Sequence, residues 1–276
     1  MTPPSEVLIR GATTLDLDAI AAVSLAAGQP PTDSGADARY TNLLLDHGSA
    51  MVAVRPDRSM LGWGATRHTP VGELLSDLFV DPHHHGRGVG GRLLRALWPG
   101  QPAAPGRFTF SSRHPAALPL YARAGLMPRW PLLYLTGDPR QLTADPAVRA
   151  TLVSADQAAA ADARLSGSPE RTADYRYWAA LGDTGVLVHE GDRLVAAGAG
   201  RHNELTHLAG SGPAQNAVIA ALVELGGTPS TVRLPGPHPV LGELLRRGWR
   251  VDDYDLAMST PDVHLATTWA YSPGLA

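Results

Sequence analysis

The sequence predicts an α/β protein built from two consecutive copies of one unit. Strand-like and helix-like stretches alternate along the 276 residues. The order of these stretches in the first half returns in the second half. Hydrophobic residues make up 44% of the chain and charged residues 18%, which is enough apolar surface to bury a core.

The first copy opens with a strand pattern at 7–10 and a helix pattern at 16–27. The helix is predicted because Thr or Asp precedes its apolar positions and a glycine follows them. A second helix pattern covers 37–49, and the strand patterns 50–56 and 60–68 flank a short polar turn that predicts a hairpin. An apolar strand pattern follows at 72–82, and a helix pattern at 88–98 comes after a glycine loop. The last elements are a strand at 107–112, a helix that ends on glycine at 115–125 and a strand at 130–137.

A polar stretch with two prolines, 138–148, is expected to be a linker between domains at 1–137 and 149–276. After it, the same order of patterns returns. The expected elements are a strand and helix at 150–167, a helix at 171–183 and a hairpin at 185–202. They are followed by a strand with a turn at 204–212, a helix at 214–227, a strand at 230–236 and a helix at 238–249. The clearest local echo is "HPAALPLYARAGL", from His114, against "HPVLGELLRRGW", from His238.

Composition excludes several classes of function. The net charge of −3 offers no basic field for a nucleic acid. The chain has no cysteine, and all 23 of its basic residues other than histidine are arginine, so neither thiol nor lysine chemistry is available. The start of the chain does not resemble a signal peptide, and no run of about 18 apolar residues could span a membrane. We therefore expect a soluble, cytoplasmic protein.

The stretch "VDPHHHGRGVGGRLLRALW" places glycines between a strand and a helix. Glycines there allow positive φ, and several backbone N–H groups can point at one anion together with the helix N-terminus. A P-loop would need lysine, and the dinucleotide pattern G-x-G-x-x-G is absent because the glycines fall at 86, 88, 90 and 91. Three consecutive histidines, His83 to His85, converge poorly on one ion, so no metal site is expected. A glycine-rich turn without a ligand is the alternative.

This loop resembles the R/Q-x-x-G-x-G/A loop of the GCN5-related N-acetyltransferase (GNAT) family, which cradles the pyrophosphate of acetyl-CoA. The preceding "LFVDP" is similar to the family's strand that ends in Val-x-Pro. One difference is His85, which stands where the family usually has Gln or Arg. The resemblance implies two tandem GNAT-like domains, each a mixed, mostly antiparallel sheet flanked by helices. It assigns coenzyme binding to Leu78, Phe79, Val80, His85, Gly86, Arg87, Gly88, Val89, Gly90, Gly91 and His114.

The second motif of the resemblance is "HPAALPLYARAGL". In the family, the pattern Asn-x-x-Ala-x-x-x-Tyr-x-x-x-Gly-Phe occupies this place. Tyr121 and Gly125 match its Tyr and Gly, whereas His114 replaces the Asn and Leu126 the Phe. The resemblance implies that Tyr121 protonates the departing coenzyme thiolate. The alternative for Tyr121 is a buried helix aromatic.

The resemblance also implies that an amine attacks the thioester and that a backbone N–H near Val80 holds the oxyanion. A base should take the proton of the amine, whose pKa is about 10. Strand alternation places Asp77 on the same face as Phe79. The sequence does not single out one base among its candidates, which are Glu73, Asp77, Asp81, His68 and Glu190.

The second copy lacks these features. Pro213 follows Gly210 and Gly212 and has no N–H to donate, and Leu244 stands at the spacing of Tyr121. We expect a degenerate copy that walls the acceptor cleft. The aromatic tail "TTWAYSPGLA" is either an ordinary arm or a segment that crosses between the halves.

The predicted function is acetyl transfer from acetyl-CoA to a small-molecule amine by direct attack in a ternary complex. The predicted protein is a monomer or homodimer. The alternatives are a non-catalytic acyl-CoA sensor and a protein N-acetyltransferase.

Overall fold

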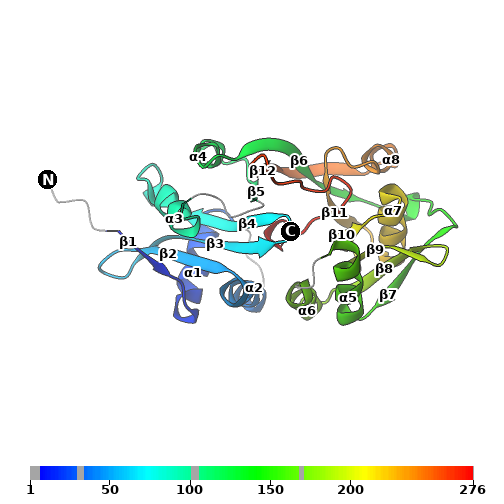
Figure 1. Cartoon of the computed structure of the whole chain (residues 1–276), viewed down its shortest axis with the longest axis horizontal. Helices are drawn as coiled ribbons and strands as arrows, with labels where there is room; N and C mark the ends of the chain where they lie inside the picture. The colour runs from blue at the N-terminus through cyan, green and yellow to red at the C-terminus, as the bar shows by residue number, and fades with distance from the viewer. Residues whose placement is uncertain (1–6, 30–33, 101–105, 168–170, 276) are drawn as a thin grey trace. The chain divides into compact units, whose positions relative to one another are not determined.

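A computed structural model describes residues 7–29, 34–100, 106–167 and 171–275. Their contacts form two compact units. The first unit consists of Met1–Thr109, Ala116–Met127 and Ser259–Val263. The second consists of Phe110–Pro115, Pro128–Met258 and His264–Ala276. Both units contain strands and helices (Figure 1).

The first unit is a sheet covered by helices on both faces. Its elements are β1 (Leu8–Gly11), α1 (Leu17–Ala26), α2 (Ser34–His47), β2 (Ser49–Val54), β3 (Met60–Thr69), β4 (Gly72–Val80), α3 (Val89–Leu97), β5 (Arg107–Ser111) and α4 (Ala117–Arg123). Strands β1 to β4 pair antiparallel in chain order, and β5 pairs parallel with β4. Helices α1 and α2 cover one face and α3 the other (Figure 1). Short 3-10 helices lie at Thr14–Asp16 and Pro82–His84.

The ladder between β4 and β5 is short. It pairs only Glu73, Leu74 and Leu75 with Arg107, Phe108 and Thr109, although β4 continues to Val80. The hydroxyl of Thr109 donates to the carbonyl of Leu75 at 2.9 Å, at the last paired position. A side chain thus takes the place of the next backbone donor, and among the described residues no strand pairs with the far edge of β4 from Ser76 onward.

The two faces of β4 carry different side chains. Phe79 lies opposite Trp63 of β3, with the two ring centroids 5.9 Å apart, on the face of α1 and α2. Leu78 and Val80 pack against Val89 and Leu93 of α3 on the other face. The predicted sharing of a face by Asp77 and Phe79 is confirmed, because Tyr40 of α2 reaches Asp77.

The second unit repeats this plan. Its elements are β6 (Met127–Gly137), β7 (Val148–Val153), α5 (Ala155–Ser166), α6 (Thr172–Ala180), β8 (Thr184–Glu190), β9 (Arg193–Arg201), β10 (Glu204–Gly210), α7 (Ala214–Leu225), β11 (Ser230–Pro235), α8 (Leu241–Arg246) and β12 (Arg250–Ser259). The strand order is β12-β6-β11-β10-β9-β8-β7. Only β10 and β11 pair parallel among the pairs described, and again over a short stretch, Glu204 and Leu205 with Thr231 and Val232. 3-10 helices lie at Pro139–Gln141 and Pro273–Leu275.

The predicted α/β fold and the repeat of its elements are confirmed. The matching ends of α4 and α8 show the repeat in detail. Gly125 and Gly248 both adopt positive φ, and the next amides, of Leu126 and Trp249, donate back to Tyr121 and Leu244 at 3.1 and 3.0 Å. The domain limits 1–137 and 149–276 remain a proposal for the ends of the two copies.

Strand β12 has no counterpart among the sequence predictions. Its residues, "RVDDYDLAMS", contain two adjacent aspartates, and its burial pattern is exposed over the first five residues. A strand with so little alternation of polar and apolar residues gives no period-2 signal.

The entry into α1 depends on a buried carboxylate. Asp16 accepts two hydrogen bonds from the Arg10 guanidinium, at 2.8 and 2.7 Å, and one from the Thr13 amide at 2.9 Å. The bonds from Arg10, more than any other contact, lower the pKa of Asp16 from 3.8 to about 2. This carboxylate therefore stabilises the fold in its charged form.

Asp16→Asn should lower the free energy of unfolding by about 1–2 kcal/mol at pH 7, after discounting for the solvent-exposed side of Arg10. Because the folded pKa is depressed, the contribution is complete above pH 3.8 and is lost as the pH falls through about 2. Urea denaturation of both proteins across this range checks it. Asp18→Asn, at an exposed position of α1, is the control. Equal stability of Asp16→Asn and wild type at pH 7 would contradict the prediction.

Candidate functional site

The glycine loop between β4 and α3 has the backbone conformation that the sequence predicts. Gly86 and Gly88 have φ of 73° and 78°, in the left-handed region. A Cβ built on either glycine would meet nothing within 4 Å, so the backbone at both positions faces open space. A ligand can therefore approach the main chain here without a side chain in the way.

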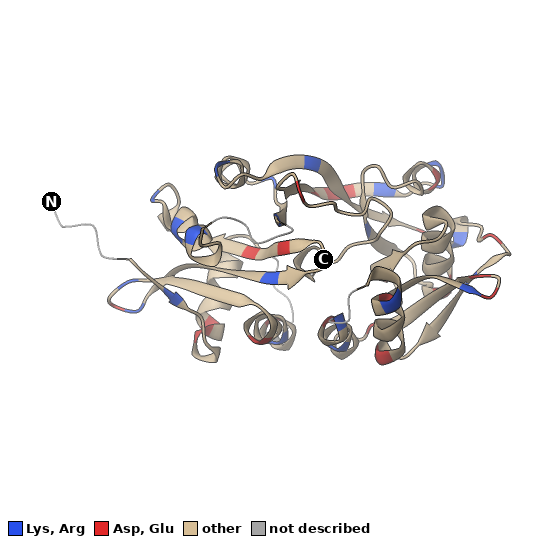
Figure 2. Ribbon diagram, viewed as in Figure 1, with Lys and Arg blue, Asp and Glu red and all other residues tan. Residues whose placement is uncertain are grey.

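The N-terminus of α3 adds backbone donors to this loop. The first helical bond runs from Arg92 N to Gly88 O at 3.0 Å, so the amides of Val89, Gly90 and Gly91 have no partner within the helix. The N-cap is Gly88, which has no side chain to accept from them. Two arginines lie further along α3, Arg92 and, in its last turn, Arg95 (Figure 2). The geometry fits an anion such as a diphosphate.

The open edge of β4 supplies further donors. The Asp81 amide donates to Leu61 O at 2.9 Å, which fixes the phase of the antiparallel ladder with β3. In such a ladder alternate residues turn their N–H and C=O away from the partner strand. Leu78 and Val80 therefore turn theirs toward the edge that β5 leaves open. These are the amides expected to bind the acyl end of the coenzyme.

The three histidines of the loop have separate partners. His85 Nε2 lies 2.9 Å from the carbonyl of Val80, and in the tautomer protonated at Nε2 it donates to that oxygen. His84 lies against the Arg55 guanidinium at 3.2 Å, and burial, then Arg55, lowers its pKa. The His83 amide donates to the Asp81 carboxylate at 2.8 Å. Among the described residues, no three His, Cys, Asp or Glu side chains gather as metal ligands would.

Helix α4, which carries Tyr121, contacts the start of α3 through Leu120. Tyr121 itself is buried, with 7% of its surface exposed. Its neighbour Leu120 lies 3.6 Å from the Cβ position of Gly90, which is equally close to Val80. The structure thus brings α4, the first turn of α3 and the end of β4 together. His114 belongs to the stretch Phe110–Pro115, which groups with the second unit, and its predicted role remains a prediction.

The candidate bases have very different surroundings. Glu73 forms an ion pair with the buried Arg107 at 3.7 Å, Asp81 caps the 3-10 helix, His68 is exposed and Glu190 pairs with Arg193. Asp77 alone of the five combines a partly buried carboxylate with a raised pKa, about 6, because burial outweighs the hydrogen bond from Tyr40. That hydrogen bond, from the Tyr40 hydroxyl to Asp77 Oδ2, is 2.7 Å long.

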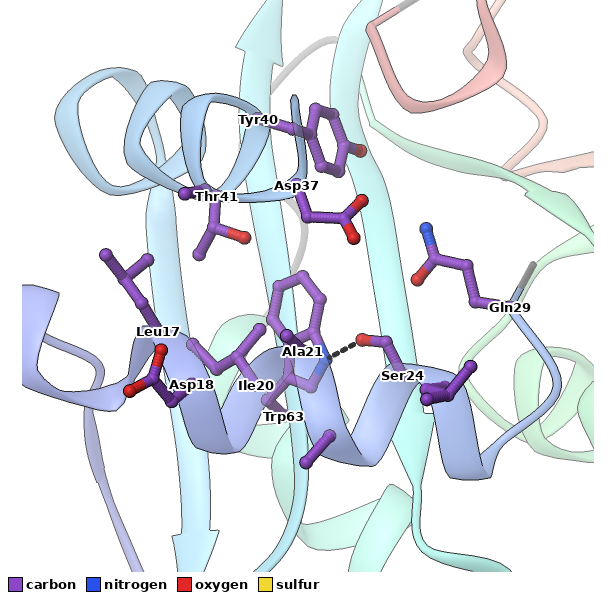
Figure 3. Close-up of a pocket in the computed structure, with 13 residues that line it drawn as sticks. Leu17, Asp18, Ile20, Ala21, Ser24, Gln29, Asp37, Tyr40, Thr41 and Trp63 are labelled. Atoms are coloured by element: carbon purple, nitrogen blue, oxygen red, sulfur yellow. Dashed lines mark hydrogen bonds between the residues drawn. The ribbon is translucent and has the colours of Figure 1, made fainter. Parts of the chain in front are cut away.

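A cavity of about 300 Å³ lies between α1 and α2 on the same face of the sheet (Figure 3). Its lining includes Trp63 of β3, whose indole N–H donates to the Ser24 hydroxyl at 2.8 Å. Tyr40 and Asp37 of α2 also line it. No motif in the sequence predicts this cavity, because it forms only when two helices and a strand pack.

In the second unit, the chain's own C-terminal tail fills the corresponding gap. Leu208 holds the place in β10 that Leu78 holds in β4, two residues before the end of the strand. Its N–H and C=O exchange hydrogen bonds with Ala270, at 3.1 and 2.9 Å. The amide of Tyr271 donates to Arg233 O on β11 at 3.1 Å. The tail therefore lies between β10 and β11, and the amide of Leu208 is already used.

Further contacts hold the tail in place. The Trp269 indole N–H donates to Gly210 O at 3.2 Å, and Arg171 donates to Leu275 O at 2.6 Å. The rings of Trp269 and Tyr271 continue an aromatic chain to the buried His207. The tail is therefore an ordinary C-terminal arm of the second unit, which is one of the two alternatives that the sequence leaves open. In the second unit, the turn that corresponds to the glycine loop leads into α7, whose N-cap is Pro213, as the sequence implied.

The comparisons with known proteins concern the fold. No protein-family profile matches the sequence. No curated protein matches it either. Solved structures do match, among them a candidate acetyltransferase from Pyrococcus horikoshii, with 15% identity, 96% of this chain and 93% of that chain covered, and a TM-score of 0.75.

Two further matches carry the GNAT name. A GCN5-related N-acetyltransferase from Sphaerobacter thermophilus has 16% identity, coverage of 96% and 98%, and a TM-score of 0.58. A tandem GNAT protein from the clavulanic acid biosynthesis pathway has 12% identity, coverage of 95% and 100%, and a TM-score of 0.59. The chain therefore has the fold of GCN5-related N-acetyltransferases, in its tandem form. Among the described helices, none has the length and apolar character that crossing a bilayer requires.

Ala270→Pro should remove the N–H that Leu208 O accepts and loosen the tail, because proline has no amide hydrogen. The expected loss is about 1–3 kcal/mol of unfolding free energy, together with faster hydrogen exchange at the Leu208 amide. Ala270→Gly keeps the N–H and is the control. Unchanged exchange at Leu208 in the proline variant would contradict the assignment of the tail.

Proposed function

We propose that this chain is an N-acetyltransferase that moves the acetyl group of acetyl-CoA to the amine of a small molecule. One observation carries the proposal. In the first unit, the last residues of β4, which do not pair with β5, are followed by the 3-10 helix Pro82–His84, the glycine loop and the N-terminus of α3. Backbone donors suited to a thioester carbonyl and to a diphosphate thus follow one another along the chain.

The coenzyme would be held mainly by backbone groups. The amides from Gly86 to Gly91 would face the diphosphate, and Arg87 would add a positive charge, whereas the His85 amide donates to Pro82 O at 3.2 Å. The full set proposed to bind acetyl-CoA is Leu78, Phe79, Val80, His85, Gly86, Arg87, Gly88, Val89, Gly90, Gly91 and His114. Because the His85 ring holds the Val80 carbonyl, it keeps the loop folded back on the strand end.

The acyl transfer would be direct. The amine nitrogen attacks the thioester carbon, and the Val80 amide donates to the oxygen that becomes negative. When the carbon–sulfur bond breaks, Tyr121 protonates the thiolate. No cysteine or lysine is available to carry the acyl group, which favours a ternary complex over a covalent intermediate.

The second unit would take no part in this chemistry. Its gap holds the tail, its loop has Pro213, and Leu244 replaces the tyrosine. We therefore propose one coenzyme per chain, whether the protein is a monomer or a homodimer. The compact cavity of the first unit fits a small amine better than a protein segment or a nucleic acid.

Gly88→Ala should weaken acetyl-CoA binding about tenfold or more. The new methyl group strains a residue with φ of 78° and projects into the open space over the loop. Gly100→Ala, at the other end of α3, also has positive φ and open space, so it matches the strain without touching the loop. Isothermal titration calorimetry measures both. Equal affinities of the two variants would contradict the proposed cradle.

Tyr121→Phe should lower kcat about 100-fold and leave the Kd of acetyl-CoA nearly unchanged, because the phenol acts only when the thiolate leaves. Release of free thiol with a panel of small amines measures kcat. Leu120→Met, on the same helix, is the control for packing. Coenzyme binding without thiol release from the wild type, for any amine, would favour a non-catalytic acyl-CoA sensor instead.

A further inference from the structure

An arginine and a histidine from distant parts of the first unit meet just before the loop proposed to bind the coenzyme, residues 85–91. Arg55 follows the last residue of β2, and His84 ends the 3-10 helix Pro82–His84. Nη2 of Arg55 lies 3.2 Å from Nε2 of His84 and 3.4 Å from its Nδ1. Both side chains are half-buried. The contact therefore joins the turn after β2 to the segment that leads into the loop.

This contact is an anchor at one end of a loop that is open in its middle. A Cβ built on Gly86 or Gly88 would meet nothing within 4 Å, so these residues are not packed against another part of the chain. At the far end, Val89 is 3% exposed and packs with Leu61. The position of the glycine backbone therefore depends on how the two ends of the loop are held.

The anchor requires an uncharged imidazole. In either neutral tautomer of His84 one ring nitrogen has a free lone pair, and Nη2 of Arg55 lies within reach of both nitrogens. A guanidinium can only donate hydrogen bonds. A doubly protonated ring has no acceptor left, and it places a second positive charge beside the first. Protonation thus turns an attractive contact into a repulsive one.

The other charges around His84 strengthen this dependence. The groups that face it are Arg55 from the turn after β2, and Asp81, His83 and Arg87 from its own segment. Burial, and after it Arg55, lowers the pKa of His84 below the ordinary value of 6.5. Because the pKa is lowered in the anchored state, the anchor is fully effective above pH 6.5 and weakens as the pH falls below that value.

We propose that Arg55 and His84 are positioning residues for the coenzyme: their contact holds the loop in the conformation that binds acetyl-CoA, and protonation of His84 releases it. The proposal rests on the proposed acetyltransferase function and names a regulation of that site by pH. Neither residue needs to touch the coenzyme, because both act through the backbone of Gly86 and Gly88.

The direction of the pH effect distinguishes this role from simple charge attraction. A proton on His84 that only added positive charge would strengthen the binding of a diphosphate. Release of the loop weakens the binding, because the backbone donors are no longer held together for the ligand.

Isothermal titration calorimetry with acetyl-CoA at about pH 7.5 and about pH 5.5 tests the direction. Between these values the Kd of the wild type should rise about tenfold more than that of His84→Asn, whose amide oxygen accepts from Arg55 but does not titrate. His83→Asn, at an exposed position of the same 3-10 helix, is the matched control and should keep the wild-type dependence. Equal changes in the wild type and His84→Asn, or tighter wild-type binding at the lower pH, overturn the proposal.

Arg55→Gln tests the partner. A glutamine can donate to the neutral ring and accept from the protonated one, so this variant should show the pH dependence of His84→Asn. In NMR titrations of the ligand-free protein, the pKa of His84 should rise in Arg55→Gln. It should not change in Arg58→Gln, which alters an exposed arginine of the same turn. An unchanged His84 pKa in Arg55→Gln, or a wild-type pH dependence of its coenzyme binding, contradicts the assigned role.

The two measurements separate this proposal from the function on which it rests. If neither the wild type nor any variant binds acetyl-CoA at either pH, the proposed function fails and the coenzyme role of the pair fails with it. The NMR titration still decides in that case whether Arg55 and His84 are joined. If acetyl-CoA binds but the wild type and His84→Asn respond equally to pH, the positioning role alone is refuted and the acetyltransferase proposal stands.

Discussion

The premature end of the ladder between β4 and β5 is the constraint on which the rest of the first unit depends. After Leu75 the Thr109 hydroxyl replaces a backbone donor, and the outer edge of β4 stays open for its last five residues. An open edge with amides at Leu78 and Val80 is costly unless something binds there, since unpaired strand groups seek a partner. The loop with Gly86 and Gly88 follows this edge after the 3-10 helix Pro82–His84 and leads into the first turn of α3, so two sets of backbone donors lie close together in the chain.

The second unit shows how the same constraint is met without a ligand. It has the same short parallel ladder, but Ala270 pairs with Leu208 inside the gap and Tyr271 reaches β11. The two copies of the fold therefore differ in what lies along the strand edge that the short parallel ladder leaves. One uses its own tail as an inserted strand, and the other keeps its edge available. This asymmetry, more than the loss of any single side chain, assigns the proposed chemistry to the first unit.

Much of this could be read from the sequence, because the informative signals were local. The glycine loop, the helix ends at Gly125 and Gly248 and the order of the elements each depend on neighbouring residues. The cavity could not be read in this way. Tyr40 and Asp77 are 37 positions apart, and nothing in either segment states that they are bonded. Likewise the tail could be recognised as aromatic, but its pairing with β10 spans about sixty residues and depends on the gap between two strands. The sequence offers five candidate bases, and the partial burial of Asp77 and its hydrogen bond from Tyr40 are visible only in the structure.

Hydrogen exchange of the full chain with and without acetyl-CoA tests the central claim most directly. Exchange at the amides of Leu78, Val80 and residues 85–91 should be slower when the coenzyme is present. Exchange at residues 208–214, where the tail already occupies the gap, should not change. Protection of residues 208–214, or an unchanged rate throughout residues 78–91 at saturating coenzyme, would contradict it.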